Sequence, residues 1–337
     1  MTRRLLKFTG FLVFFLLAAG FGGMTYFHYG NPQNTCASCH EMTGVHAAWS
    51  TSAHRNFHCR NCHGGSLTLD VHALRSHLDR VVQHVAGMPA EQIRLSEEHV
   101  LSVHAACRNC HPRQFADWQA SRHSATYARI FLDPVHNTTE MLSPDCLRCH
   151  GMFSDGNIED LVTPTSTTGP WSLKDPVKAG QPAIPCLACH QVHTPAAGST
   201  TRPEAKAAQL YVRHELAYFP TDMLPVTPIW QGERAVKLSP DPCQRLCVQC
   251  HSPDAFRQLG SSDDRTPAGV HEGLNCSACH NSHSNSAKAS CSICHPASSH
   301  CGRDVEKMDT TFGVPTSKHN IHTVACADCH DGKRPGK

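Results

Sequence analysis

Hydrophobic residues are unevenly distributed along the chain, with one long apolar run near the N-terminus. Residues 8–27 contain no charged side chain, whereas three basic residues stand within the first seven positions. A helix that spans a bilayer needs about 20 apolar residues, and a positive flank stays on the cytoplasmic side. The pattern therefore predicts a retained N-terminal membrane anchor over residues 1–30. A cleaved signal peptide, processed near Ala18-Ala19-Gly20, is the alternative.

Apolar residues also recur at helical spacing in later segments. The clearest is residues 70–87, where Asp70 is a candidate N-cap and Gly87 a candidate C-terminal stop. Two further helices are expected over residues 90–106 and 204–218.

Turn-forming residues dominate other parts of the chain. Residues 154–185 are rich in Gly, Pro, Thr and Ser and are expected to form a long loop or linker. The C-terminal third is expected to form short irregular segments. The predicted fold class is therefore mostly α with extensive irregular loops, preceded by one transmembrane helix.

Composition changes this picture, because the 337 residues include 20 Cys and 27 His while only 17% are charged. A disulfide-stapled secreted domain would explain the cysteines but not the histidines. A disordered chain would carry more charge. The remaining apolar residues are few for a core of this size, so something other than side chains must fill the interior. A formal net charge of +2 gives no electrostatic case for nucleic-acid binding.

The cysteines identify this filler, because the pattern Cys-x-x-Cys-His occurs nine times. We number these motifs 1–9 in chain order. Two thiols at this spacing bond covalently to one porphyrin edge, and the adjacent imidazole binds the iron. Zinc sites do not require a histidine after every cysteine pair, and a redox dithiol occurs once rather than nine times. The sequence therefore predicts nine covalently bound c-type haems. The cysteines are Cys36, Cys39, Cys59, Cys62, Cys107, Cys110, Cys146, Cys149, Cys186, Cys189, Cys247, Cys250, Cys276, Cys279, Cys291, Cys294, Cys326 and Cys329; the histidines are His40, His63, His111, His150, His190, His251, His280, His295 and His330.

The histidines outside the motifs are candidate sixth ligands of the haem irons, with a surface or hydrogen-bonding role as the alternative for each. Some are favoured by repeated placement. The pattern Trp-x-x-Ser-x-His ends at His54 and His123, and Cys-x-x-Cys-His-x-x-His ends at His193 and His283. Others are favoured because they stand a few residues before a motif, namely His271, His319 and His322. Weaker candidates are His72, His77, His84, His104, His136, His214 and His300. The sequence does not pair any of them with a particular haem.

Two cysteines lie outside the motifs, Cys243 and Cys301. Two alternatives remain: the two cysteines form a disulfide in an oxidising compartment, or both are unpaired thiols.

The N-terminal half resembles the NapC/NirT family of membrane-anchored quinol dehydrogenases, which includes the NrfH-type subunits. The resemblance covers about residues 1–150. It is carried by Cys36-Ala37-Ser38-Cys39-His40-Glu41-Met42, Trp49, Ser52-x-His54, Cys59-Arg60-Asn61-Cys62-His63, and the segment from Glu98 to Cys107-Arg108-Asn109-Cys110-His111. Motif 4 departs from the family because it lacks the usual following histidine.

The resemblance implies roles for several residues near the membrane. Met42 would be an axial ligand of the first haem and leave one iron face open toward quinol, and His54 would be a distal ligand of another haem. Asp79 lies about where the family carries an acidic quinol-site residue; a solvated helix carboxylate is the alternative. His72 is a candidate partner of Asp79, since quinol oxidation needs groups that accept protons.

The expected protein is a cytochrome of the cytoplasmic (inner) membrane with its haems in the periplasm. Residues 1–30 are the anchor, 31–152 a NapC/NirT-like domain with motifs 1–4, and 153–337 a multihaem domain with motifs 5–9. Its expected partners are membrane menaquinol or ubiquinol, the lipid bilayer and a periplasmic redox protein. The alternatives are a terminal reductase of a nitrogen or sulfur oxyanion and a pure electron-transfer subunit. No motif ends in lysine, which argues against a nitrite-reducing haem.

Overall fold

The structure is a computed structural model of the chain, and its elements fall into two compact units. It describes residues 2–30, 37–64, 81–87, 95–139, 141–144, 146–164, 168–190, 192, 228–251, 265–287, 290–295 and 303–329. The first unit comprises residues 1–110 with 190–200, and the second comprises residues 111–189 with 201–337. The predicted boundary at residue 152, between the domain with motifs 1–4 and the domain with motifs 5–9, stays a prediction.

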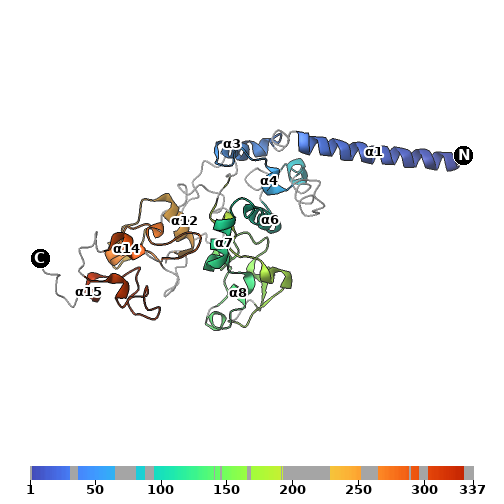
Figure 1. Cartoon of the computed structure of the whole chain (residues 1–337). Helices are drawn as coiled ribbons and strands as arrows, with labels where there is room; N and C mark the ends of the chain where they lie inside the picture. The colour runs from blue at the N-terminus through green and yellow to red at the C-terminus, as the bar shows by residue number, and fades with distance from the viewer. Residues whose placement is uncertain are drawn as a thin grey trace. The chain divides into compact units, whose positions relative to one another are not determined.

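The first unit begins with α1 (Thr2–Gly30), the longest helix in Figure 1. Its large apolar side chains are exposed, and those of Phe14 and Leu17 keep 69% and 68% of their surface. Within the described residues, no helix combines the length and the apolar character needed to cross a bilayer. The predicted transmembrane helix is therefore not confirmed.

The rest of the first unit consists of short helices around motifs 1–3. They are η1 (His40–Met42), α3 (Thr43–Thr51), α4 (Arg60–His63) and α6 (Glu97–Cys107). Helix α6 begins later than the predicted residue 90, because Ser96 is extended and its hydroxyl accepts a hydrogen bond from His99 N at 3.3 Å.

The helix predicted over residues 70–87 is described only at its C-terminal end. Residues 81–85 are helical, and Gly87 adopts a φ of 69°. Only glycine enters this left-handed region without a steric penalty, so the chain leaves the helix there and the predicted stop is confirmed. Residues 65–80, including Asp70, His72, His77 and Asp79, lie outside the described residues.

A hydrophobic core occupies the first half of the second unit. It is built from α8 (Tyr127–Phe131), α9 (Cys146–Cys149), α10 (Ile158–Leu161) and an antiparallel pair of strands, β1 (Val162–Thr163) and β2 (Ser172–Leu173). Its buried members are Tyr127, Phe131, Leu142, Leu147, Ile158, Leu161, Val162, Trp171 and Ala183.

The prediction of a long loop over residues 154–185 is therefore wrong. This segment supplies half of that core, because a capping box at Asn157 starts α10 and places Ile158 and Leu161 against the other members. The composition was typical of a loop because polar turn residues separate these few apolar side chains. The same half of the unit also holds α7 (Pro112–Ala120), η3 (Arg122–Ser124), η4 (His136–Thr138), η5 (Pro176–Gly180) and η6 (Cys186–Ala188).

The described part of the second half of this unit consists of short helices and strands, where irregular segments were predicted. They are β3 (Trp230–Gln231), β4 (Arg234–Ala235), α12 (Pro242–His251), η8 (Gly269–His271), η9 (Cys276–Ala278), α14 (Ser290–Cys294), η10 (Val305–Lys307) and α15 (Cys326–Cys329). Strands β3 and β4 form a hairpin, and Ile229, Val236 and Ala268 make a small apolar cluster beside it. The helix predicted over residues 204–218 lies outside the described residues.

Candidate haem sites

Helical turns bring thiols and imidazole together in several of the described motifs. The histidine N–H donates to the carbonyl of the first cysteine in motif 2 at 3.0 Å, in motif 4 at 3.0 Å, in motif 7 at 2.9 Å and in motif 8 at 2.7 Å. Residues three and four apart share one face of such a turn. The two cysteines and the histidine therefore point to the same side, as attachment to one porphyrin edge requires.

No disulfide joins the motif cysteines that the structure describes. Cys36, His330 and the candidate ligand His193 lie outside the described residues, and only the backbone of Cys329 is described. In motif 1, Cys39 is half-buried and His40 exposed. The available donor set, two thiols and one imidazole, fits covalent haem at each described motif.

Three motif histidines of the second unit each face another histidine. The ring centres are 6.2 Å apart for His123 and His251, 6.4 Å for His271 and His295, and 6.0 Å for His280 and His322. An iron held between two imidazoles by bonds of about 2 Å separates the ring centres by roughly 6 Å. These three pairs have the spacing of two axial ligands.

His63 of motif 2 faces His99 in the first unit. The His63 Nδ1 and His99 Nε2 atoms are 2.9 Å apart, and the ring centres 5.2 Å. His99 is buried at 6% exposure because α6 packs its face against α4. Sequence reasoning missed His99. The available signal was its position four residues before Val103, which places both side chains on one buried helical face.

His40 of motif 1 lies beside His84, with the ring centres 5.5 Å apart. His84 was a weaker candidate than Met42, which lies in η1 and is half-buried. The structure thus brings a histidine to motif 1 from the end of the helix at residues 81–85, in addition to the methionine within the motif's own segment.

The repeated pattern Trp-x-x-Ser-x-His is a repeated local structure. Ser52 ends α3 and donates to Trp49 O at 2.8 Å, while accepting from His54 N at 3.1 Å. The second copy matches it closely. Ser121 ends α7, donates to Trp118 O at 2.7 Å and accepts from His123 N at 3.2 Å.

The other candidate ligands have different surroundings. His54 lies 6.2 Å from the Phe57 ring, and His319 Nδ1 lies 4.0 Å from an oxygen of Asp328. His283 is half-buried, and its N–H donates to Asn281 Oδ1 at 3.0 Å. Of the remaining motif histidines, His111 and His190 are exposed and His150 is half-buried.

Thiols of neighbouring motifs lie close enough to perturb one another before haem attachment. Burial and the nearby Cys107 and Cys110 of motif 3 raise the pKa of Cys62 in motif 2. Burial raises the pKa of Cys189 in motif 5 to about 11, with a further contribution from Cys250 of motif 6. Each of these contacts joins two motifs that are consecutive in the chain.

The same succession continues toward the C-terminus. A hydrogen bond from Cys247 of motif 6 lowers the pKa of Cys276 in motif 7 to about 7. Burial and the nearby Cys291 and Cys294 of motif 8 raise the pKa of Cys279. Motifs 5–8 therefore form an uninterrupted spatial series in the second unit. Motif 4 joins it at motif 6, where α9 packs against α12 and Arg148 Nη2 donates to Gln249 Oε1 at 3.4 Å.

Cys243, outside the motifs, is an exposed free thiol at the start of α12. Its carbonyl accepts from Cys247 Sγ at 3.5 Å. Cys301 lies outside the described residues.

Comparison with protein families adds one match to these observations. Residues 106–166 match the family model of cytochrome c554 and c-prime, over a segment that contains motifs 3 and 4 and His123. The chain is a multihaem c-type cytochrome. The match supports covalently bound c-type haem and haem-based electron transfer, and it does not confirm the resemblance of this cytochrome to the NapC/NirT family. No curated protein sequence and no solved structure matches the cytochrome significantly.

Proposed function

We propose that this cytochrome carries nine haems, takes electrons from a membrane quinol near motif 1 and relays them to an acceptor protein in the periplasm. When bound, haem supplies one-electron exchange between ferric and ferrous iron. The observation that carries the proposal is the set of facing histidine pairs at motifs 6, 7 and 8, whose ring centres are 6.2, 6.0 and 6.4 Å apart, respectively.

Facing histidines favour a relay over a terminal reductase. A catalytic haem needs one free iron face for its substrate, whereas two imidazoles occupy both faces. The contiguous motifs 5–8, joined through Cys189, Cys247 and Cys279, also suit a relay, because electron transfer requires closely spaced centres.

We propose that electrons enter the protein in the first unit. The exposed apolar side chains of α1 suit contact with lipid, and five residues separate its last residue, Gly30, from Cys36 of motif 1. A short tether of this kind keeps motif 1 near the hydrocarbon region in which quinols reside. We place the haem-bearing part on the periplasmic side of the cytoplasmic membrane, where the positive N-terminal flank would leave it.

Quinol oxidation releases two electrons and two protons. The electrons would reduce two ferric irons, one electron each, and the protons would pass to side chains and then to water. Asp79 and His72, which lie outside the described residues, are the proposed first proton acceptors. Met42 is the proposed axial ligand at motif 1, and an open iron face there requires that His40 does not bind the same iron. Its rival is His84, which faces His40 in the structure.

The test is anaerobic reduction of the full-length holoprotein in liposomes by a menaquinol analogue, followed by the haem absorbance. We expect reduction in the wild type, and slower reduction in Met42→His, because an imidazole in place of the thioether lowers the potential of the first haem. Intact mass must correspond to nine haems. Absence of reduction, or a Met42→His variant reduced at the wild-type rate, contradicts quinol entry at motif 1. Turnover of nitrite, hydroxylamine or a sulfur oxyanion would instead favour a terminal reductase.

Membrane attachment has its own measurement. After alkaline carbonate extraction, we expect the full-length chain to stay with the membrane fraction. Release into the supernatant would contradict attachment through α1.

A further inference from the structure

Two histidines of the second unit lie near one motif in the sequence and near another in space. His271 stands five residues before motif 7, but its ring faces His295 of motif 8 at 6.4 Å. His322 stands four residues before motif 9, but its ring faces His280 of motif 7 at 6.0 Å, with the two planes only 4° apart.

We infer a crossed arrangement, in which each of these histidines binds the haem of a motif other than the one that it precedes in the sequence. His322 is the distal axial ligand of the haem attached at motif 7, and His271 is the distal axial ligand of the haem attached at motif 8. The inference deepens the proposed relay but depends only on haem attachment at the two motifs. It stands whether or not quinol is the electron donor.

Hydrogen bonds on the far side of each ring orient the nitrogen that would bind iron. His271 Nδ1 lies 3.1 Å from Ile321 O, and His322 Nδ1 lies 3.1 Å from Asn320 Oδ1. A carbonyl oxygen only accepts, so each Nδ1 carries the proton and each Nε2 keeps its lone pair. Histidines that ligate metals characteristically donate their second nitrogen to such an acceptor.

The two ligand segments are also bound to each other through their backbones. Ala268 N donates to His322 O at 2.7 Å, and Val270 N donates to Val324 O at 2.9 Å. Gly269 makes this approach possible, because it has a φ of 61° and an added Cβ would collide with Val324 O. Each ligand is therefore held by the segment that carries the other.

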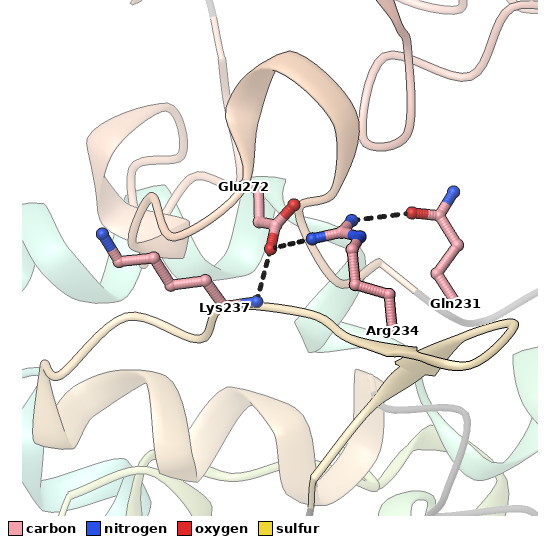
Figure 2. Close-up of polar contacts among 4 residues, drawn as sticks. All are labelled: Gln231, Arg234, Lys237 and Glu272. Atoms are coloured by element: carbon pink, nitrogen blue, oxygen red, sulfur yellow. Dashed lines mark hydrogen bonds and ion pairs between the residues drawn. The ribbon is translucent and has the colours of Figure 1, made fainter.

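A polar clamp holds Glu272, the residue that follows His271, and Figure 2 shows its contacts. Glu272 Oε1 accepts from Arg234 Nη1 at 2.7 Å and from Lys237 N at 2.6 Å. Arg234 Nη2 in turn donates to Gln231 Oε1 at 2.9 Å, within the β3–β4 hairpin. Glu272 directly follows His271, so this clamp makes Glu272 a positioning residue for the ligand.

The experiment replaces each distal histidine by methionine in the full-length holoprotein and follows axial ligation by magnetic circular dichroism and EPR. We expect His271→Met and His322→Met each to convert one haem from bis-histidine to histidine–methionine ligation. The matched control is His58→Met, a change at an exposed histidine, which should produce no such haem. A variant whose axial-ligation spectra are the same as those of the wild type overturns the assignment of that ligand.

Removal of one haem at a time then locates each ligand. Cys276→Ala/Cys279→Ala deletes the motif 7 haem, and Cys291→Ala/Cys294→Ala deletes the motif 8 haem. The histidine–methionine signal of His271→Met should vanish only in the second background, and that of His322→Met only in the first. The reverse pattern, or a signal that survives in both backgrounds, overturns the crossing.

A milder substitution keeps the inference testable if a haem-deleted variant does not fold. Glu272→Gln removes the charge of the clamp and should shift the EPR signal of one low-spin haem, the same signal that His271→Met abolishes. Asp304→Asn, which disrupts the more exposed 2.7 Å pair with Lys307, should shift none. If Glu272→Gln shifts an EPR signal that His271→Met leaves unchanged, the placement of His271 is overturned. No shift at all overturns the positioning role.

Discussion

The two Trp-x-x-Ser-x-His turns, one in each unit, have the same local structure and different surroundings. In both, a serine ends a helix, donates to the tryptophan carbonyl and accepts from the histidine N–H, with distances that agree within about 0.1 Å. His123 nevertheless faces His251 across the spacing of an iron site, whereas His54 lies beside Phe57.

The difference shows that the turn orients a histidine ring but does not supply the second histidine that faces it. The serine cap fixes the backbone after the helix and hence the direction of the ring. The partner of His123 comes from α12, more than a hundred residues later in the chain, and only packing within the second unit brings it there. A local repeat therefore identifies a candidate ligand without identifying its haem.

The largest test of this comparison replaces the two histidines. His123→Ala should convert one haem from low-spin to high-spin, because the haem of motif 6 loses its sixth ligand. EPR of the ferric protein measures the change. If that high-spin signal persists after Cys247→Ala/Cys250→Ala has deleted the motif 6 haem, His123 serves another haem. His54→Ala is the matched variant, and a different haem must respond to it if the two turns serve separate haems.

A smaller effect is expected from the tryptophans of the two turns. Trp118 Nε1 donates to Ile184 O at 3.2 Å, whereas the Trp49 ring lies 5.3 Å from the His46 ring. Trp118→Phe should cost about 1–3 kcal/mol, since it leaves a half-buried carbonyl without this donor. Thermal unfolding of the holoprotein measures the loss. A Trp49→Phe variant destabilised more than Trp118→Phe would contradict the unequal anchoring of the two turns.

The smallest effect is expected from the capping serines. Ser121→Ala should destabilise the holoprotein by about 1 kcal/mol, because one side chain both donates and accepts a hydrogen bond. Ser121 is buried at 5% exposure while Ser52 is only half-buried, so Ser52→Ala should cost less. Denaturant titrations compare the free energies of unfolding of the two variants directly. Equal losses of stability would mean that the burial of the capping serine does not determine its contribution.

Sequence reasoning succeeded where the chemistry is local and failed where it depends on distant packing. Covalent attachment needs only five consecutive residues, so every motif was visible, and Gly87 marked a helix end through its own backbone freedom. The core around Ile158 and Trp171 was missed, because its few apolar residues are separated by turn residues and meet only after folding. His99 was missed because its partner His63 lies 36 residues away.

The sequence by itself determined the cofactor class, and it predicts nine attachment motifs and a pool of spare histidines. Each of these depends on covalent spacing within a few residues. Only the tertiary structure brought His99 to motif 2, His123 to motif 6, and His322 and His271 to motifs 7 and 8. The physical reason is that an axial ligand must lie within a bond length of the iron. The number of residues between two positions in the chain does not determine their distance in space.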